Sequence, residues 1–156
     1  MFDDLRDLYQ EVILDHGKHP RNYRHPPDAN CEAQGDNPIC GDRLIVYLTV
    51  DDSGVVKDCG FVGQGCAIST ASASMMTEVV VGKHKDEVLA LFHHFHDLCT
   101  KDEDQRGDYG AIDEDALERL VVLSGVRQFP VRVKCATLPW HTMAAAIGGD
   151  VKASTE

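Results

Sequence analysis

Three cysteines that lie far apart in the sequence each stand next to a signal that turns the chain or begins a helix. Cys40 lies in the segment Asn-Pro-Ile-Cys-Gly-Asp at residues 37–42, Cys66 follows Gly-Gln-Gly, and Cys135 precedes a segment with a helical pattern. With Asp42, the three thiols make a plausible four-coordinate site for zinc or iron. A chain that builds this site must bring a turn and the starts of two helices together, and most of the sequence then serves as the frame.

The segment 37–42 places a thiol and a carboxylate two residues apart in a turn. Proline fixes its own φ and pushes the preceding residue out of the helical region, and Gly41 bends freely between Cys40 and Asp42. A structural zinc site usually takes a fourth Cys or His, whereas a carboxylate is a harder and more exchangeable ligand. Asp42 therefore predicts a site that opens. Cys40, on its glycine-flanked turn, is the best candidate for the nucleophilic thiolate that opening would release.

Cys66 and Cys135 are both expected immediately before a helix. Exposed backbone N–H groups and the helix dipole stabilise a thiolate at such a position. Arg132 and Lys134 share one face if the chain before Cys135 is an extended strand. We interpret these two cations as partners that offset the negative charge of the thiolates and the carboxylate, with Arg132 also placed to hold Asp42.

Cysteine is also commonly buried as a small hydrophobic residue. No two of the three candidate cysteines form a local Cys-x-x-Cys pair, so their spacing alone leaves open whether they bind a metal or are buried apolar side chains. For the remaining cysteines we expect burial without a role in a site: Cys31, Cys59 and Cys99.

Histidines offer further candidate ligands. His93, His94 and His96 fall on the side of a predicted helix opposite its apolar stripe, so we expect a solvated helix surface there. His141 lies near the site end of the last predicted helix and is a weaker candidate.

The hydrophobic pattern predicts one domain over residues 1–149, followed by a flexible tail at 150–156. A charged insertion is expected at about residues 99–118. Helices are predicted at 2–16, 67–81, 85–98, 113–125 and 136–147, and strands at 31–36, 44–50 and 55–62. The segment 126–134 is expected to be extended.

Charge and composition exclude some classes of function. The chain has 15 Lys and Arg against 26 Asp and Glu, a formal net charge of −11, which argues against nucleic acid and against an anionic membrane surface. Neither a signal peptide nor an apolar run long enough to span a membrane is evident, so we expect a cytoplasmic protein. In that compartment six cysteines are expected as free thiols or metal ligands.

The three cysteine segments together resemble the IscU/NifU-like iron–sulfur cluster assembly family. The matching segments are Asn37-Pro38-x-Cys40-Gly41-Asp42, Gly63-x-Gly65-Cys66-Ala67-Ile68-Ser69 with the Ala-Ser-Ala-Ser-Met-Met run that follows, and Lys134-Cys135-Ala136-x-Leu138 with Trp140. The resemblance covers nearly the whole chain and implies four metal ligands: Cys40, Asp42, Cys66 and Cys135. The implied fold is α+β, a small, about three-stranded antiparallel sheet with helices packed against it.

Two departures indicate a branch of that family. Its scaffold proteins have a histidine immediately before the third cysteine, where this chain has Lys134, and they lack the insertion at 99–118. Both features, with Arg132, are similar to the SufU branch. That resemblance implies a zinc protein that takes persulfide sulfur from a SufS-type cysteine desulfurase, whose pyridoxal phosphate belongs to the partner, and that acts with downstream iron–sulfur assembly proteins.

Three functional hypotheses follow. In the first, the chain is a zinc-dependent sulfurtransferase in which the Cys40 thiolate attacks the persulfide, although it then acts partly as a sulfur-accepting co-substrate rather than an enzyme. In the second, the same thiolates hold an iron–sulfur cluster that is built on the protein and delivered to apo-proteins. In the third, zinc is purely structural and the domain is an adaptor, a reading that Asp42 disfavours.

Overall fold

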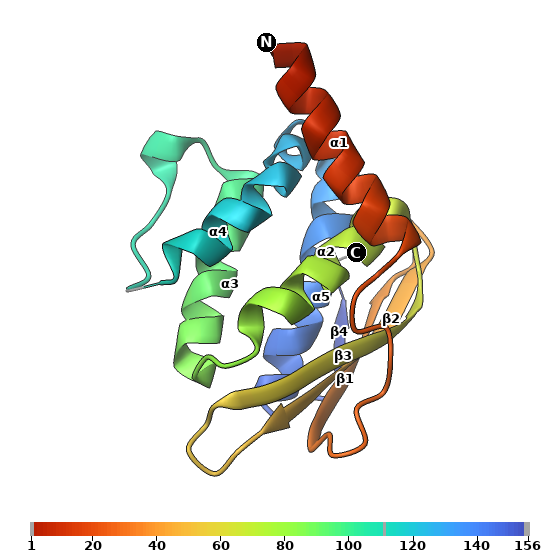
Figure 1. Ribbon diagram of the computed structural model, residues 1–156, viewed down its shortest axis with the longest axis vertical. Coiled ribbons are helices and arrows are strands. Elements are labelled where there is room, and N and C mark those ends of the chain that lie inside the picture. Colours follow the sequence, from red (N-terminus) through yellow and green to blue (C-terminus); the bar gives the residue numbers. More distant parts are fainter. Residues whose placement is uncertain (1, 111, 155–156) are drawn as a thin grey trace.

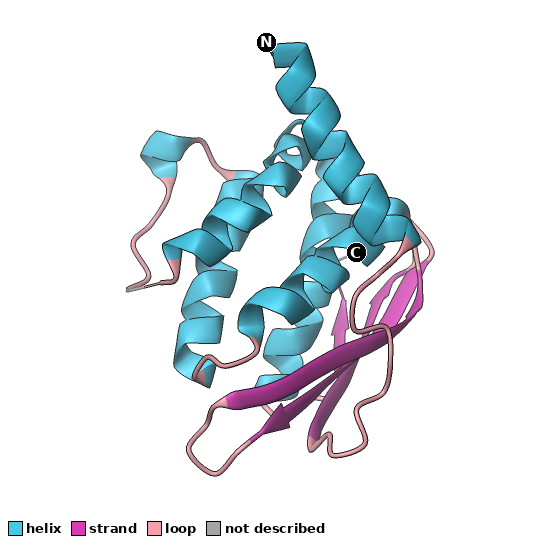
Figure 2. Cartoon of the chain, in the orientation of Figure 1, coloured by secondary structure: helices cyan, strands magenta, loops and turns pink. Residues whose placement is uncertain are grey.

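The computed structural model describes residues 2–110 and 112–154, with the side chains of all of these except residues 2–9 and 103. The chain forms two layers, in which the helices gather on one face of a sheet (Figures 1 and 2). Four strands make the sheet: β1 (Cys31–Asn37), β2 (Asp42–Val50), β3 (Val56–Gln64) and β4 (Lys152–Ser154). Their order is β3-β2-β1-β4. The α+β class is as predicted, with one strand more than expected.

The fourth strand comes from the segment that was predicted to be a flexible tail. Lys152–Ser154 pairs in parallel with residues 34–36 of β1, whereas β1 with β2 and β2 with β3 are antiparallel. The pairing is possible because the turn after the last helix returns the chain to the open edge of β1, where the Gln34 N–H donates to the carbonyl of Val151. So short a strand takes its stability from that edge rather than from its own sequence.

The remaining layer contains α1 (Phe2–Lys18), α2 (Ala67–Val80), α3 (Lys85–Thr100), α4 (Glu114–Leu120) and α5 (Pro130–Ile147), with two 3₁₀ helices, η1 (Glu103–Gln105) and η2 (Val121–Gln128). Most of β2 is buried, and Leu44, Val46 and Leu48 belong to the core. Thr142 of α5 lies directly over Gly35 of β1, where a Cβ would overlap its hydroxyl. The sheet and α5 are therefore in close contact.

The start of α5 differs most from the sequence prediction. The helix begins at Pro130, six residues before the expected start, because Pro130 occupies the first helical turn, where its missing N–H costs nothing. Cys135 is consequently inside the helix rather than just before it. Pro139, expected in the first turn, lies in the middle of α5 and has no N–H to donate to the carbonyl of Cys135 four residues earlier.

The described part of the charged insertion beyond α3, residues 101–110 with 112 and 113, forms a strap beside α3. Asp97, only 3% exposed, holds it: its carboxylate accepts hydrogen bonds from the Gly107 N–H at 2.9 Å and the Tyr109 hydroxyl at 2.7 Å, and Lys101 Nζ lies 3.4 Å away. These bonds outweigh the burial that opposes the charged form, and the pKa of Asp97 is lowered. The insertion is thus anchored at one buried carboxylate.

The strap and α5 also change the surroundings of the histidines on α3. His93 is exposed as predicted, but His94 and His96 are half-buried. His94 meets the ring of Tyr109 from the strap, and its Nε2 is buried without a hydrogen-bond partner, while His96 meets His141 of α5. The prediction of a solvated face was wrong for these two residues. The apolar pattern of a helix indicates which face packs against the core, but it does not indicate which other elements cover the remaining faces.

No helix within residues 2–110 and 112–154 combines the length and the apolar character needed to cross a membrane.

Candidate metal centre

The hairpin between β1 and β2 positions Cys40 and Asp42. Asn37 ends β1 fully buried, its side-chain oxygen accepts the Ile39 N–H at 3.1 Å, and its amide nitrogen lies 3.7 Å from Cys40 Sγ as a hydrogen-bond donor. Gly41 has a φ of 74°, a left-handed conformation that suits glycine. The turn therefore leaves the Cys40 thiol half-exposed and the Asp42 carboxylate fully buried.

Cys66 caps the N-terminus of α2, as the sequence predicted. Its Sγ accepts the Ser69 N–H at 3.4 Å, and its own backbone N–H donates to Asp42 Oδ1 at 2.8 Å. The Cys66 Sγ also lies 3.9 Å from Asp42 Oδ2. A Cβ on Gly65 would come within 2.8 Å of Asp42 Oδ1, so the residue before Cys66 must be small for the carboxylate to approach.

Cys135 reaches the same point from the second turn of α5. Its side chain is fully buried, and its thiol donates to Cys40 Sγ across a sulfur–sulfur distance of 3.3 Å. Burial raises the pKa of Cys135, and hydrogen bonds to Asp42 and Cys40 raise it further. All six cysteines are free thiols, so this pair is not a disulfide.

Three of the four predicted ligands converge. One ligand atom from each of Cys40, Asp42 and Cys135 lies within 4.8 Å of the other two, and no other group of three or more Cys, His, Asp or Glu does so among the residues described. Cys66 lies at the edge of this group, where Asp42 links it to the others.

The donor set suits a tetrahedral ion. Ligand atoms about 2.0–2.3 Å from a tetrahedral zinc ion lie roughly 3.3–3.8 Å from one another. The separations of 3.3 Å between two sulfurs and 3.9 Å between sulfur and oxygen are close to that range without any ion present. Cys40, Asp42 and Cys135 are therefore spaced to hold an ion such as zinc, and Cys66 would have to move closer to join them as a fourth ligand.

Arg132 and Lys134 do not share a face, because they lie two residues apart on a helix and not on a strand. Arg132 is one helical turn before Cys135. Its pKa is raised, first by the charge of Cys66 and then by a hydrogen bond with Cys135. The guanidinium thus approaches the site sulfurs from solvent, and Lys134, the residue before Cys135, is half-buried.

The other cysteines lie outside this group. Cys59 and Cys99 are fully buried, and burial raises the pKa of both thiols, that of Cys99 to about 12. Cys31 is half-buried at the start of β1. Sequence reasoning missed the roles of Asn37 and Gly65, which it interpreted only as residues that favour a turn. Their positions near Cys40 and Cys66 in the sequence could have suggested a role in the site. Their contacts with the Cys40 sulfur and the Asp42 carboxylate, however, depend on the fold.

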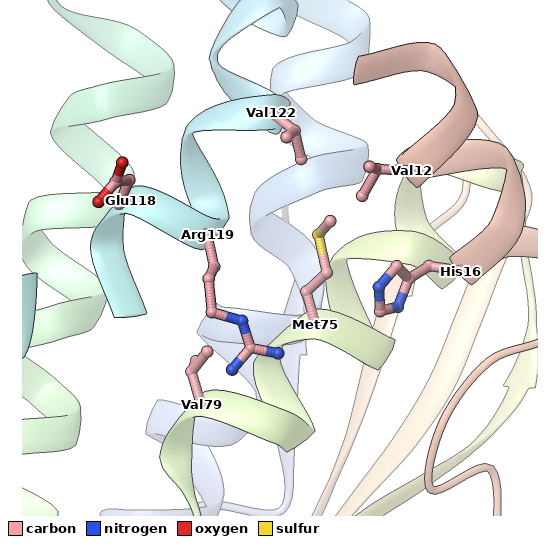
Figure 3. Close-up of a pocket in the computed structure, with 7 residues that line it drawn as sticks. All are labelled: Val12, His16, Met75, Val79, Glu118, Arg119 and Val122. Atoms are coloured by element: carbon pink, nitrogen blue, oxygen red, sulfur yellow. The ribbon is translucent and has the colours of Figure 1, made fainter. Parts of the chain in front are cut away.

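None of the four predicted ligands lines the hollow of about 240 Å³ whose lining residues are drawn in Figure 3. Its lining comes from α1, α2, α4 and η2: Val12, His16, Met75, Val79, Glu118, Arg119 and Val122. Two of its polar groups have partners: His16 Nδ1 is 2.7 Å from the Ser74 hydroxyl, and Arg119 forms an ion pair of 3.2 Å with Glu78. The third, Glu118, is exposed. The rest of the lining is apolar and brings no cluster of reactive groups together.

The fold and the centre together define a class of small α+β protein in which one hairpin and two helices bring thiols and a carboxylate to a common point. Residues 8–136 match the family model described as the NifU-like N terminal domain. The chain belongs to this family.

Several relatives are similar over most of their length. The chain is 41% identical over 145 residues to the "Iron-sulfur cluster assembly scaffold protein IscU" of Streptococcus pyogenes serotype M1, covering 92% of this chain and 84% of that protein. It is 39% identical over 145 residues to the "Zinc-dependent sulfurtransferase SufU" of Bacillus subtilis strain 168, covering 92% of each.

A solved structure is similar as well. The crystal structure of an iron–sulfur cluster assembly scaffold protein for the SUF system, from Fervidobacterium islandicum AW-1, superposes with a TM-score of 0.75 at 32% identity. The match covers 88% of this chain and 94% of that one.

Proposed function

We propose that this chain is a zinc-dependent sulfurtransferase of iron–sulfur cluster assembly, which accepts persulfide sulfur from a SufS-type cysteine desulfurase on Cys40. The observation that carries the proposal is the pairing of a half-exposed Cys40 thiol with a buried carboxylate and a second buried thiol. The similarity to the Bacillus subtilis protein named a zinc-dependent sulfurtransferase supports it. We place the activity in the cytoplasm, where six free thiols stay reduced.

Cys40, Asp42, Cys66 and Cys135 would hold the zinc ion. A bound zinc ion keeps coordinated cysteines as thiolates at neutral pH. Arg132 approaches these sulfurs from solvent and offsets part of their negative charge. Lys134, next to Cys135 in the sequence, is the second cation that we assign to the site.

Cys40 is the acceptor because its thiol is half-exposed and lies on a turn next to Gly41. Cys135 is buried, and the Cys66 sulfur is held as the cap of α2. Its thiolate attacks the terminal sulfur of the desulfurase persulfide. A new sulfur–sulfur bond forms on Cys40, the old one breaks, and the electron pair leaves on the desulfurase thiolate. The proton of the persulfide stays on the transferred sulfur or passes to water. Sulfur then moves on to downstream assembly proteins.

The test measures cysteine desulfurase turnover with the zinc-loaded chain, with zinc content and the mass of Cys40-containing peptides followed in the same samples. We expect stimulation, retained zinc and one added sulfur on Cys40. Cys40→Ala should abolish acceptance, whereas Cys31→Ser, which alters a half-buried thiol outside the site, should not. Full sulfur acceptance by Cys40→Ala would refute the proposal.

A scaffold role is the second candidate, supported by the similarity to the Streptococcus pyogenes protein named an iron–sulfur cluster scaffold. The same thiolates would ligate a cluster. In the assay above, this role requires no stimulation of the desulfurase, together with replacement of zinc by a cluster that moves to an apo-protein. Lys134 favours the sulfurtransferase, because lysine before the third cysteine is similar to the SufU branch, whereas the scaffold branch is expected to have histidine there.

A further inference from the structure

Three imidazoles surround Phe92 where α3 packs against α5. The ring centroid of Phe92 lies 5.3 Å from that of His93, 6.1 Å from that of His96 and 5.0 Å from that of His141. The His96 and His141 rings are themselves 5.5 Å apart, with their planes at 82°. This histidine cluster, His93, His96 and His141, shares no residue with the thiol site.

The separation of His96 and His141 matches that of two ligands on one ion. Two imidazoles that bind a tetrahedral ion through nitrogens about 2.0–2.1 Å away have ring centroids roughly 5 Å apart. The two histidines come from different helices, so the pair bridges α3 and α5. Because the two ring centroids already lie 5.5 Å apart, α3 and α5 need not shift for both rings to reach one ion.

His93 supplies a third nitrogen. It lies three residues before His96, and side chains at that spacing are neighbours on a helix surface. Its ring is exposed and lies against Phe92 and Tyr109, so rotation about its side-chain bonds can bring it to the pair. That rotation is required, because the three histidines are not among the described residues whose donor atoms already converge.

The pair is also in the protonation state that binds metals. Burial lowers the pKa of both His96 and His141, and the neighbouring histidines lower it further. Asp97 opposes this effect at His96, while Lys101 adds to it. Both rings are therefore neutral at pH 7, as metal coordination needs.

We propose that His96 and His141, joined by His93, form a second metal site that binds a divalent first-row transition ion such as Zn²⁺, Ni²⁺ or Co²⁺. Imidazole is a favourable ligand for these ions, whereas Mg²⁺ and Ca²⁺ require oxygen ligands. Since no thiolate takes part, binding is weaker and more exchangeable than at the cysteines. Cys135 and His141 are six residues apart on α5, which corresponds to a rise of about 9 Å along the helix. An ion at the histidines would therefore be distinct from an ion at the thiols but close to it.

An ion at this site would also stabilise the fold. It binds only when α3 and α5 are packed, so it favours the folded state by mass action. The second ion would thereby hold in place the helix that carries Cys135. This consequence gives a readout that does not depend on any sulfur-transfer assay.

The experiment begins with protein that already carries one equivalent of Zn²⁺ on its thiols and titrates it with Co²⁺ against a chromophoric chelator. We expect a second equivalent to bind, with visible bands of an imidazole site, no sulfur-to-cobalt charge-transfer band and a higher thermal midpoint. His96→Asn and His141→Asn should each weaken the second site by at least about tenfold, as loss of even an outer partner often does. His19→Asn, at an exposed histidine of the loop after α1, is the matched control.

A measurement on the unmodified sequence guards against loss of fold in the variants. Paramagnetic Co²⁺ should broaden the imidazole proton signals of His96 and His141 at lower concentrations than those of His19 and His25. The proposal is overturned if only one equivalent binds in total, if the second equivalent persists in both variants, or if His19→Asn removes it equally. Broadening of His19 or His25 first would mean adventitious surface binding only and would also overturn it.

Discussion

The backbone N–H of Cys66 donates a 2.8 Å hydrogen bond to Oδ1 of Asp42, a residue 24 positions earlier in the chain. One predicted ligand therefore orients another before any metal arrives. Two hydrogen bonds fix Cys66, because its sulfur also accepts the Ser69 N–H and so caps α2. The carboxylate, which was predicted to be the exchangeable ligand, is thus held beside the sulfurs by a backbone N–H.

Gly65→Ala tests that relationship. The new methyl group would lie 2.8 Å from Asp42 Oδ1 and push the carboxylate away from the Cys66 N–H. We expect zinc affinity to fall by about 10–100-fold, the usual effect of disturbing groups that orient ligands, with little change in helix content. Competition with a zinc chelator measures this. Gly125→Ala, where a Cβ meets open space, should leave affinity unchanged, and equal losses in both variants would contradict the mechanism.

Gly35→Ala tests the contact between β1 and α5. The added Cβ would overlap the hydroxyl of Thr142, so we expect destabilisation by about 1–3 kcal/mol from overpacking. Urea unfolding measures the change. The double variant with Thr142→Ala removes the overlapping oxygen and should recover part of the loss. Failure of the second substitution to restore any stability would show that the strain arises elsewhere.

Asp97→Asn tests the anchor of the strap. The carboxylate accepts hydrogen bonds from Gly107 and Tyr109, and its neutral replacement should cost about 1.5–3 kcal/mol. The folded-state pKa lies below the ordinary 3.8, so the stabilisation is complete above about pH 4 and is lost as pH falls through the folded pKa. Unfolding of Asp97→Asn should lack this acid-dependent component. Asp104→Asn, on the exposed strap, should retain it.

His16→Gln tests a second pH dependence of stability. His16 is a base and Asp97 an acid, but both have a lowered folded-state pKa, so both make the protein less stable as pH falls. Burial lowers the folded-state pKa of His16 below 6.5, Arg21 and Arg119 add to this, and Glu78 and Asp15 oppose it. The unfolded chain then binds the proton more tightly, so His16 lowers stability as pH falls below about 6.5. The urea midpoint of His16→Gln should fall less than that of the parent between about pH 7.5 and about pH 5.5. His19→Gln should behave like the parent.

Much of the fold could be predicted because local patterns and tertiary packing agree in it. The run of β-branched and aromatic residues in β2 and the small-residue helix after Cys66 could be recognised without knowledge of their neighbours. The capping position of Cys66 followed from glycines and a helical pattern in one short segment. Fold class and most element bounds therefore follow from periodicity and turn chemistry.

The sequence predictions were wrong where contacts with a neighbouring element determine the local structure. Pro130 begins α5 although residues 126–134 lack a helical signal, so Cys135 changed from a cap to an interior position and Lys134 lost its shared face with Arg132. His96 is covered by α5, and β4 forms only because β1 offers it an open edge. None of these contacts is encoded within the segment that makes it.

Cys40 and Cys135 lie 95 positions apart in the chain, and this distance has a consequence for its synthesis. A ribosome completes the hairpin and the cap of α2 long before the last helix emerges. If the proposed zinc site forms, an ion captured before α5 docks would find only two thiols and one carboxylate and would dissociate readily. Tight metal loading would then mark a finished molecule, and truncated chains that end before α5 should emerge metal-poor.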